Sequence, residues 1–169
     1  MVERPASVVK ELIENSIDAG ANSITIELKD GGLQMISIQD NGSGIDANNI
    51  EKAVKRHATS KIKTATDLTE ISSMGFRGEA LAAISSVSEL TLASRTQNSP
   101  KGRKLELKDA KLKSNEAWNG PPGTLVIVEN LFASMPARAK FMKNSTRRPD
   151  AILFDWNDTL ADNWASIHA

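Results

Sequence analysis

The chain has 169 residues, of which 40% are hydrophobic and 25% charged, a composition typical of one soluble globular domain with room for an incomplete second piece. It contains no cysteine, which excludes a disulfide framework and a thiolate zinc site. The 21 basic and 21 acidic residues cancel, so net charge gives no argument for nucleic-acid binding, and without an apolar signal peptide or membrane span we expect a cytoplasmic protein.

The first predicted element is an amphipathic helix over residues 6–19. Pro5 suits the first turn of a helix, where its missing N–H costs nothing. Gly20 suits a left-handed cap at the other end. Together they predict where this helix begins and ends.

A hairpin and a second helix follow. Residues 23–28 and 35–40 alternate apolar and polar side chains on either side of the turn sequence KDGG, which predicts two antiparallel strands. Asp46 offers an N-cap for a helix that runs to about Lys55.

The middle of the chain is less regular. Residues 56–77 show poor periodicity, and a loop of this length in a compact domain is usually functional or mobile. A mostly buried helix is predicted at 79–87 and a strand at 89–94.

The last third contains many Gly, Pro and Asn residues between 97 and 123, which predicts a surface excursion around one short strand at 104–107. Residues 124–132 form a continuous apolar run typical of a central strand, and 137–142 suit a short basic helix. Because strands and helices intermix without regular alternation, we predict an α+β fold with one mixed, mainly antiparallel sheet and helices layered on one face.

Two polar residues, Glu11 and Asn15, lie one turn apart beside the apolar face of the first helix, which includes Val8, Leu12 and Ile17. A buried unpaired carboxylate is unfavourable, so Glu11 either finds a partner or points into a cleft. A partly solvated helix edge is the commoner explanation when such a pair is considered alone.

Asp40 ends the second strand of the hairpin on the same face as Ile36 and Ile38. An inward carboxylate followed by the loop NGSG favours a pocket in which the carboxylate accepts a hydrogen bond from a ligand amine, while the glycines let the ligand approach the backbone. The alternative is an aspartate that turns the chain through its own backbone bonds.

Four motifs, ELIENSIDAGA, DNGSGI, RHATSKI and GFRGEALAAISSVS, resemble in this order and spacing the amino-terminal ATPase of MutL-type DNA mismatch-repair proteins. That family belongs to a wider ATPase group with type II topoisomerases, heat-shock chaperones and histidine kinases. The Glu, the Asn and the DxGxG loop are shared by the whole group, whereas RHATSKI and GFRGEAL are specific to the mismatch-repair branch. The resemblance covers about Val2 to Phe141 and implies the ATPase fold of the group.

The resemblance implies a magnesium-dependent ATPase site. By resemblance, Glu11 is the general base that polarises water, Asn15 is the magnesium ligand, and Asp40 accepts a hydrogen bond from the adenine amine and so selects ATP over GTP. The other nucleotide-contacting residues implied lie in the glycine loop, two lid segments and the pocket floor: Gly42, Gly44, Thr59, Ser60, Lys61, Gly75, Phe76, Arg77, Gly78 and Thr124.

The resemblance also implies partners. In the family, ATP binding drives homodimerisation, and the dimer transmits a signal from a mismatch-recognition protein to other mismatch-repair factors. Weak DNA contact through basic residues is implied as well, although a solvated surface is the alternative. Two basic clusters are candidates: Lys101, Arg103, Lys104, Lys108, Lys111 and Lys113, and then Arg138, Lys140, Lys143, Arg147 and Arg148.

Three departures from the family pattern bear on activity. A segment that normally precedes Met1 and a second domain that supplies a lysine to the γ-phosphate are missing, and Ala133, Met135 and Ala139 weaken the match near its end. We therefore expect a truncated ATPase domain at 1–145 that binds ATP and hydrolyses it poorly, because a missing cation removes transition-state stabilisation. The alternative is a non-catalytic remnant or binding module.

The tail AILFDWNDTLADNW resembles the first motif of haloacid-dehalogenase-like phosphatases, a strand that ends in DxDxT. Asp155 and Thr159 match, but Asn157 replaces the second aspartate and only ten residues follow Thr159. A phosphatase is therefore not expected. Residues 146–169 are predicted to be an unrelated tail from a fusion or frame disruption, and a native element with this sequence by chance is the alternative.

Overall fold

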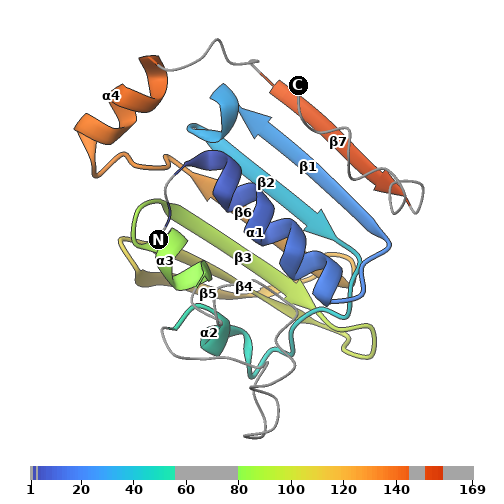
Figure 1. Ribbon diagram of the computed structural model, residues 1–169. Coiled ribbons are helices and arrows are strands. Elements are labelled where there is room, and N and C mark those ends of the chain that lie inside the picture. Colours follow the sequence, from blue (N-terminus) through green and yellow to red (C-terminus); the bar gives the residue numbers. More distant parts are fainter. Residues whose placement is uncertain (1, 3, 56–79, 145–150, 158–169) are drawn as a thin grey trace, which may run out of the picture.

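The computed structural model describes residues 2, 4–55, 80–144 and 151–157. Seven described strands form one sheet in the order β5-β4-β3-β6-β2-β1-β7 (Figure 1). The strands are β1 (Ser23–Lys29), β2 (Met35–Asp40), β3 (Glu89–Arg95), β4 (Gly102–Lys108), β5 (Lys111–Trp118), β6 (Gly123–Glu129) and β7 (Ala151–Asn157). The helices are α1 (Pro5–Asp18), α2 (Ile50–Ala53), α3 (Ala80–Ser85) and α4 (Pro136–Asn144), with a short 3-10 turn η1 (Asp30–Gly32).

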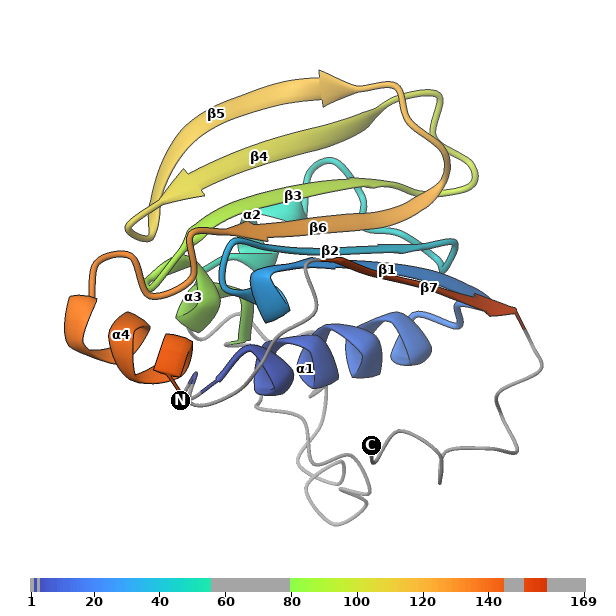
Figure 2. The same cartoon turned by 90° about the horizontal axis from the view of Figure 1, so that it is seen from above.

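The predicted α+β class is confirmed. Every pair of neighbouring strands within the described ranges is antiparallel, and α1 and α3 lie on the same side of the sheet (Figure 2). None of the helices in the described part of the chain has the length and apolar character needed to cross a membrane.

The face of the sheet that α1 covers is built from rows of directly opposed apolar residues. In one row, Ile38 lies opposite both Ile26 and Val126. The same row continues because Leu92 lies opposite both Val126 and Leu105. Opposed residues of antiparallel strands share a face, so this single row crosses five strands. Four of the five side chains are buried, and the fifth, Ile26, packs against them.

Helix α1 ends as the sequence predicts. Gly20 has φ of 72°, and its N–H donates to the carbonyl of Ile17 at 2.9 Å. The N–H of Ala21 donates to the carbonyl of Ser16 at 3.1 Å. These two bonds form the paired cap that satisfies the last carbonyls of a helix, and they turn the chain toward β1.

The buried face of α1 is narrower than the sequence suggests. Val8, Leu12 and Ser16 are buried at four-residue intervals, whereas Ile17 is 46% exposed. A helix on a flat sheet buries a stripe centred on one line of residues, so a side chain about 100° from that line stays in water. The serine at the third position of the stripe therefore belongs to the core side of α1.

Two predicted elements were wrong in extent. The helix expected from Asp46 to Lys55 forms only at Ile50–Ala53. The Asp46 carboxylate accepts the N–H of Asn48 at 2.9 Å, which makes a local turn before the helix begins.

The surface excursion expected at 97–123 is instead the hairpin β4–β5. The sequence pattern predicts β4 but not β5, because six of the eight residues of β5 are exposed. An edge strand that is exposed on both faces does not need alternating apolar and polar side chains. The sequence pattern that identifies the other strands is therefore missing from β5. The predictions of β6 as a central strand and of a short helix at α4 are confirmed.

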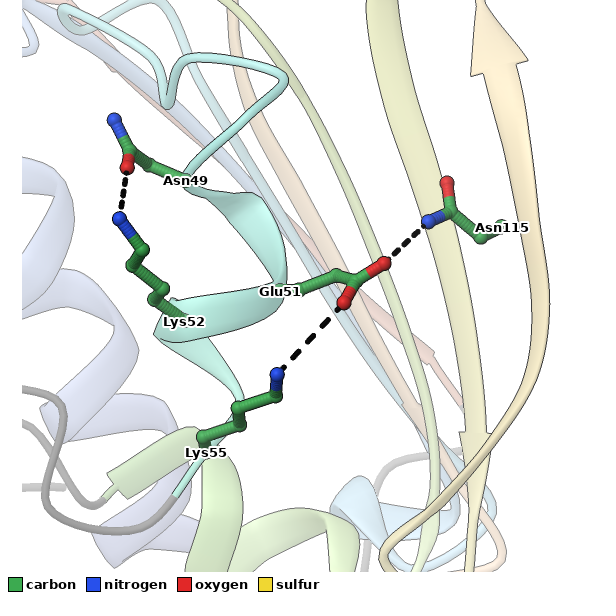
Figure 3. A network of polar contacts seen from close by, with 5 residues as sticks. All are labelled: Asn49, Glu51, Lys52, Lys55 and Asn115. Atoms are coloured by element: carbon green, nitrogen blue, oxygen red, sulfur yellow. Dashed lines mark hydrogen bonds and ion pairs between the residues drawn. The ribbon is translucent and has the colours of Figure 1, made fainter.

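Helix α2 is joined to β5 by an exposed polar network (Figure 3). The Glu51 carboxylate accepts a hydrogen bond from the Asn115 amide at 2.7 Å and pairs with Lys55 at 3.8 Å. Within α2, Lys52 donates to the amide oxygen of Asn49 at 2.8 Å. Exposed pairs of this kind stabilise a fold by less than about 1 kcal/mol. They therefore contribute to the orientation of α2 and add little to the stability of the protein.

Strand β7 lies within the predicted tail. It pairs antiparallel with β1 from Ser23 to Lys29, so β1 is not an edge of the described sheet. Strand pairing uses main-chain groups, so it does not depend on where the tail sequence comes from.

Candidate functional site

One row on the α1 side of the sheet is polar instead of apolar. Asp40 on β2 lies opposite Thr124 on β6, and Thr124 lies opposite Ser94 on β3. Asp40 is 8% exposed and Ser94 is fully buried. Because the adjoining row of Ile38 and Val126 is apolar, this row marks the border between the core and a polar site.

The Asp40 carboxylate is held by three hydrogen bonds. Its Oδ1 accepts the N–H groups of Gly42 at 2.9 Å and Thr124 at 3.2 Å. Its Oδ2 accepts the Ser16 hydroxyl at 2.9 Å. Each carboxylate oxygen can accept two hydrogen bonds, so with respect to the described residues Oδ1 is saturated and Oδ2 has one acceptor direction left. Asp40 thus serves the local turn through Oδ1 and can meet a ligand donor through Oδ2.

The loop after Asp40 packs closely on its neighbours. A Cβ on Gly42 would lie 2.9 Å from the Cβ and the carbonyl oxygen of Ala19, at the end of α1. Gly44 has φ of 69°, and a Cβ there would lie 2.1 Å from the carbonyl oxygen of Arg95. The loop can therefore approach both α1 and β3 only because these two residues lack side chains.

Gly123, at the start of β6, is equally restricted. Its φ is 116°, a conformation open almost only to glycine, and a Cβ would lie 2.0 Å from the Asp40 carbonyl oxygen. We expect Gly123→Ala to lower the free energy of unfolding by about 2 kcal/mol or more, measured by urea denaturation. Gly20→Ala is the matched control, because Gly20 also has positive φ but nothing within 4 Å of its Cβ position. Equal losses in the two variants would contradict the close packing at Gly123.

Helix α1 brings Glu11 and Asn15 to this region. Both side chains are half-buried, and the helix is tied to Asp40 through Ser16, the residue after Asn15. The Asn15 side chain has no hydrogen bond to another described residue, which leaves its amide oxygen available to a ligand.

A cation at this site would need oxygen atoms from outside the described residues. Within the described ranges, no group of three His, Asp or Glu side chains could hold a metal ion. The Asn15 oxygen suits magnesium, which keeps water ligands and binds phosphate oxygens beside one or two protein oxygens. The residues present therefore fit a magnesium ion that arrives with a phosphate ligand.

Only some of the predicted site residues can be placed. The structure positions six of them around α1, the glycine loop and the polar row: Glu11, Asn15, Asp40, Gly42, Gly44 and Thr124. The other seven lie outside the described residues: Thr59, Ser60, Lys61, Gly75, Phe76, Arg77 and Gly78.

Three further residues of the site were missed in the sequence. Ser94 continues the inward alternation of Leu90 and Leu92, so its face could have been inferred. Ser16 lies four residues after Leu12 on the buried stripe. Nothing in the local sequence marks Gly123, because the close contact that excludes a side chain there is with Asp40 on β2, a strand distant in sequence.

The first basic cluster is divided by the sheet. Arg103 lies opposite Ser94 and hence on the helix-covered face, while the next residue, Lys104, is on the other face and pairs with Glu106 at 2.6 Å. Lys108 pairs with Glu89 at 2.9 Å. The hydrogen bond between these two side chains and the attraction of their opposite charges lower the pKa of Glu89 and raise the pKa of Lys108.

In the second cluster, the Arg138 guanidinium lies 5.0 Å from the centre of the Phe132 ring. This contact is a cation–π interaction with a fully buried aromatic side chain. Arg147 and Arg148 lie outside the described residues.

Comparison with known proteins agrees with this arrangement. Residues 3–140 match the family described as histidine kinase-, DNA gyrase B- and HSP90-like ATPase. The chain is 53% identical over 144 residues to the DNA mismatch repair protein MutL of Neisseria meningitidis serogroup C, and 52% identical over 145 residues to that of Halothermothrix orenii. These alignments cover 85% and 86% of the chain but only 22% of each relative.

Solved structures show the same fold. The Aquifex aeolicus MutL ATPase domain complexed with ADP superposes with a TM-score of 0.67 at 33% identity, covering 83% of this chain and 48% of that one. The amino-terminal domain of a DNA repair protein gives a TM-score of 0.66 at 38% identity, covering 82% and 39%. The chain therefore belongs to the histidine kinase-, DNA gyrase B- and HSP90-like ATPase family and is homologous to the ATPase domain of MutL.

Proposed function

We propose that this chain binds ATP with magnesium beside α1 and the polar row, as the ATP-binding and ATP-hydrolysing module of a MutL-type DNA mismatch-repair protein. The observation that carries the proposal is the fixed Asp40 carboxylate with one acceptor direction left on Oδ2. The related Aquifex domain was solved in complex with ADP, an adenine nucleotide.

Asp40 selects the base. The adenine amine donates to Oδ2, whereas guanine would present a carbonyl oxygen at the same place. Two acceptors facing each other in a buried site cannot form a hydrogen bond, and each loses its water. A site that pairs with a hydrogen-bond donor binds a ligand with an acceptor at the same position much more weakly, so ATP is preferred over GTP.

Glu11 and Asn15 act on the phosphates. Glu11 orients and polarises the attacking water as a general base, and Asn15 offers its amide oxygen to magnesium. When bound, magnesium neutralises charge on the phosphate oxygens. The lid residues implied by the family motifs, Thr59 to Lys61 and Gly75 to Gly78, complete the phosphate contacts in this proposal.

The proposed function includes partners outside this chain. In a longer protein of this family, the module would form a homodimer on ATP binding and act with a mismatch-recognition protein and other mismatch-repair factors. Its contact with DNA would be weak, because Lys104 and Lys108 are already paired with glutamates. Residues 146–169 are proposed to be a separate tail, which the end of the family match at residue 140 supports.

A thermal-unfolding experiment on the purified chain tests this function. Magnesium ATP at about 100 times its dissociation constant should stabilise the fold by about 2.7 kcal/mol. Magnesium GTP at the same concentration should give no shift, and chelation of magnesium should reduce the shift produced by ATP. Equal shifts with ATP and GTP, or none with either, would overturn the proposal. Binding without phosphate release would favour the alternative of a non-catalytic binding module.

A further inference from the structure

A buried serine beside the site has no part in the chemistry proposed above. Ser94 is fully buried in β3, and its hydroxyl has three polar partners from two other parts of the chain. It donates to the carbonyl of Gly123 at 2.8 Å, accepts the N–H of Ile45 at 2.8 Å, and lies 2.9 Å from the Thr124 hydroxyl. The loop after Asp40, the start of β6 and the end of β3 therefore meet at one oxygen atom.

The number of donors and acceptors around the Ser94 hydroxyl determines which group donates in each hydrogen bond. A serine hydroxyl has one proton to donate and two lone pairs that accept. With its proton on the Gly123 carbonyl and one lone pair on the Ile45 N–H, Ser94 can only accept from Thr124. The Thr124 hydroxyl is thereby made the donor of this pair. Its own oxygen then offers only lone pairs to the pocket.

The same oxygen also holds the glycine loop in place. Ile45 directly follows Gly44, whose missing Cβ lets the loop lie against Arg95. The Ile45–Ser94 bond is the side-chain hydrogen bond that joins this end of the loop to β3. At the other end, the Gly42 N–H is bound to Asp40. The loop is thus fixed at both ends by buried side chains.

We propose that Ser94 is a positioning residue of the nucleotide pocket: it presents Thr124 as a hydrogen-bond acceptor and clamps the loop of residues 41–45 against the sheet. This inference rests on the proposed function, since the ligand it serves is ATP. Ser94 itself is too deeply buried to touch the nucleotide, so it acts through Thr124 and the loop.

Nucleotide affinity tests the proposal in the complete chain. Ser94→Ala removes the shared partner of one buried and two partly buried polar groups, and we expect the dissociation constant for magnesium ATP to rise about tenfold by calorimetry. Ser94→Thr keeps the hydroxyl and should restore binding to within about threefold of the parent. Ser85→Ala is the matched control: Ser85 is also fully buried, but its hydroxyl donates only to the Ala82 carbonyl in α3. This control should bind ATP like the parent.

Amide hydrogen exchange of the ATP-free chain provides an independent readout. The Ile45 N–H should exchange at least about tenfold faster in Ser94→Ala, and unchanged in Ser85→Ala, after correction for global stability. If the parent binds no ATP while Ile45 behaves in this way, the proposed function fails and the clamp stands as a feature of the fold.

Parental ATP affinity in Ser94→Ala, or unchanged protection of Ile45, would overturn the inference. If Ser94→Ala does not fold, Ser94→Cys serves instead, because a thiol of similar size is a weaker hydrogen-bonding group. Like Ser94→Ala, this variant should weaken ATP binding and lower the protection of the Ile45 N–H from exchange. Parental values of both quantities would again overturn the inference about Ser94.

Discussion

Replacing Asp40 by Asn is expected to abolish the stabilisation by ATP while leaving the fold intact. The amide oxygen of Asn can keep the bonds to the Gly42 and Thr124 N–H groups, and its NH₂ group then takes the place of Oδ2. The Ser16 hydroxyl can accept from that NH₂ group and turn its own proton to the Leu12 carbonyl, which lies 3.1 Å away. The hydrogen-bond partners of Asp40 all stay paired in this variant, so the free energy of unfolding should change little.

The ligand meets a different site in this variant. The second N–H of the Asn amide points where Oδ2 would accept the adenine amine in the proposed complex, so two donors would face each other. We expect the shift of about 2.7 kcal/mol at saturating magnesium ATP to disappear. Asp46→Asn is the matched control, because Asp46 is exposed and its carboxylate only caps the turn at Asn48. A shift of parental size in Asp40→Asn would show that Asp40 does not bind the base.

Replacing Glu11 by Gln is expected to separate binding from hydrolysis. Glutamine keeps the size of the side chain but cannot take a proton from water. General-base catalysis contributes about 100-fold to 10,000-fold, so phosphate release should fall by at least about 100-fold. The dissociation constant for magnesium ATP should stay within about threefold of the parent, because the proposed role of Glu11 is to activate the attacking water and not to bind the adenine ring.

The control for this prediction lies on the same helix. Glu14 is one turn along α1 and pairs with Lys10 at 3.6 Å on the surface. Glu14→Gln should lose less than about 1 kcal/mol of stability and hydrolyse ATP at the parental rate. Hydrolysis in Glu11→Gln at the rate of Glu14→Gln would exclude Glu11 as the base. A parent chain that binds ATP but releases no phosphate would instead identify a binding module.

Helix α1 and the β1–β2 hairpin could be predicted from the sequence because their signals are local. Pro5 and Gly20 mark the start and end of α1, and Gly20 does adopt the left-handed cap. The alternation of residues 35–40 correctly assigned Asp40 to the inward face of β2. Likewise, Glu11 and Asn15 share one side of a helix whatever that helix packs against.

The polar row could not be predicted in this way, because it joins three strands that are far apart in the chain. Asp40, Thr124 and Ser94 become neighbours only through the register of β2, β6 and β3. The restriction at Gly123 likewise depends on a carbonyl more than 80 residues earlier, and the edge strand β5 has no alternation to reveal it.

The sequence by itself therefore determined helix α1, the β1–β2 hairpin and the inward face on which Asp40 lies, because helix and strand periodicity act over a few residues. The tertiary structure decided which groups hold Asp40 and the glycine loop in place, because strand register and burial depend on contacts across the whole sheet.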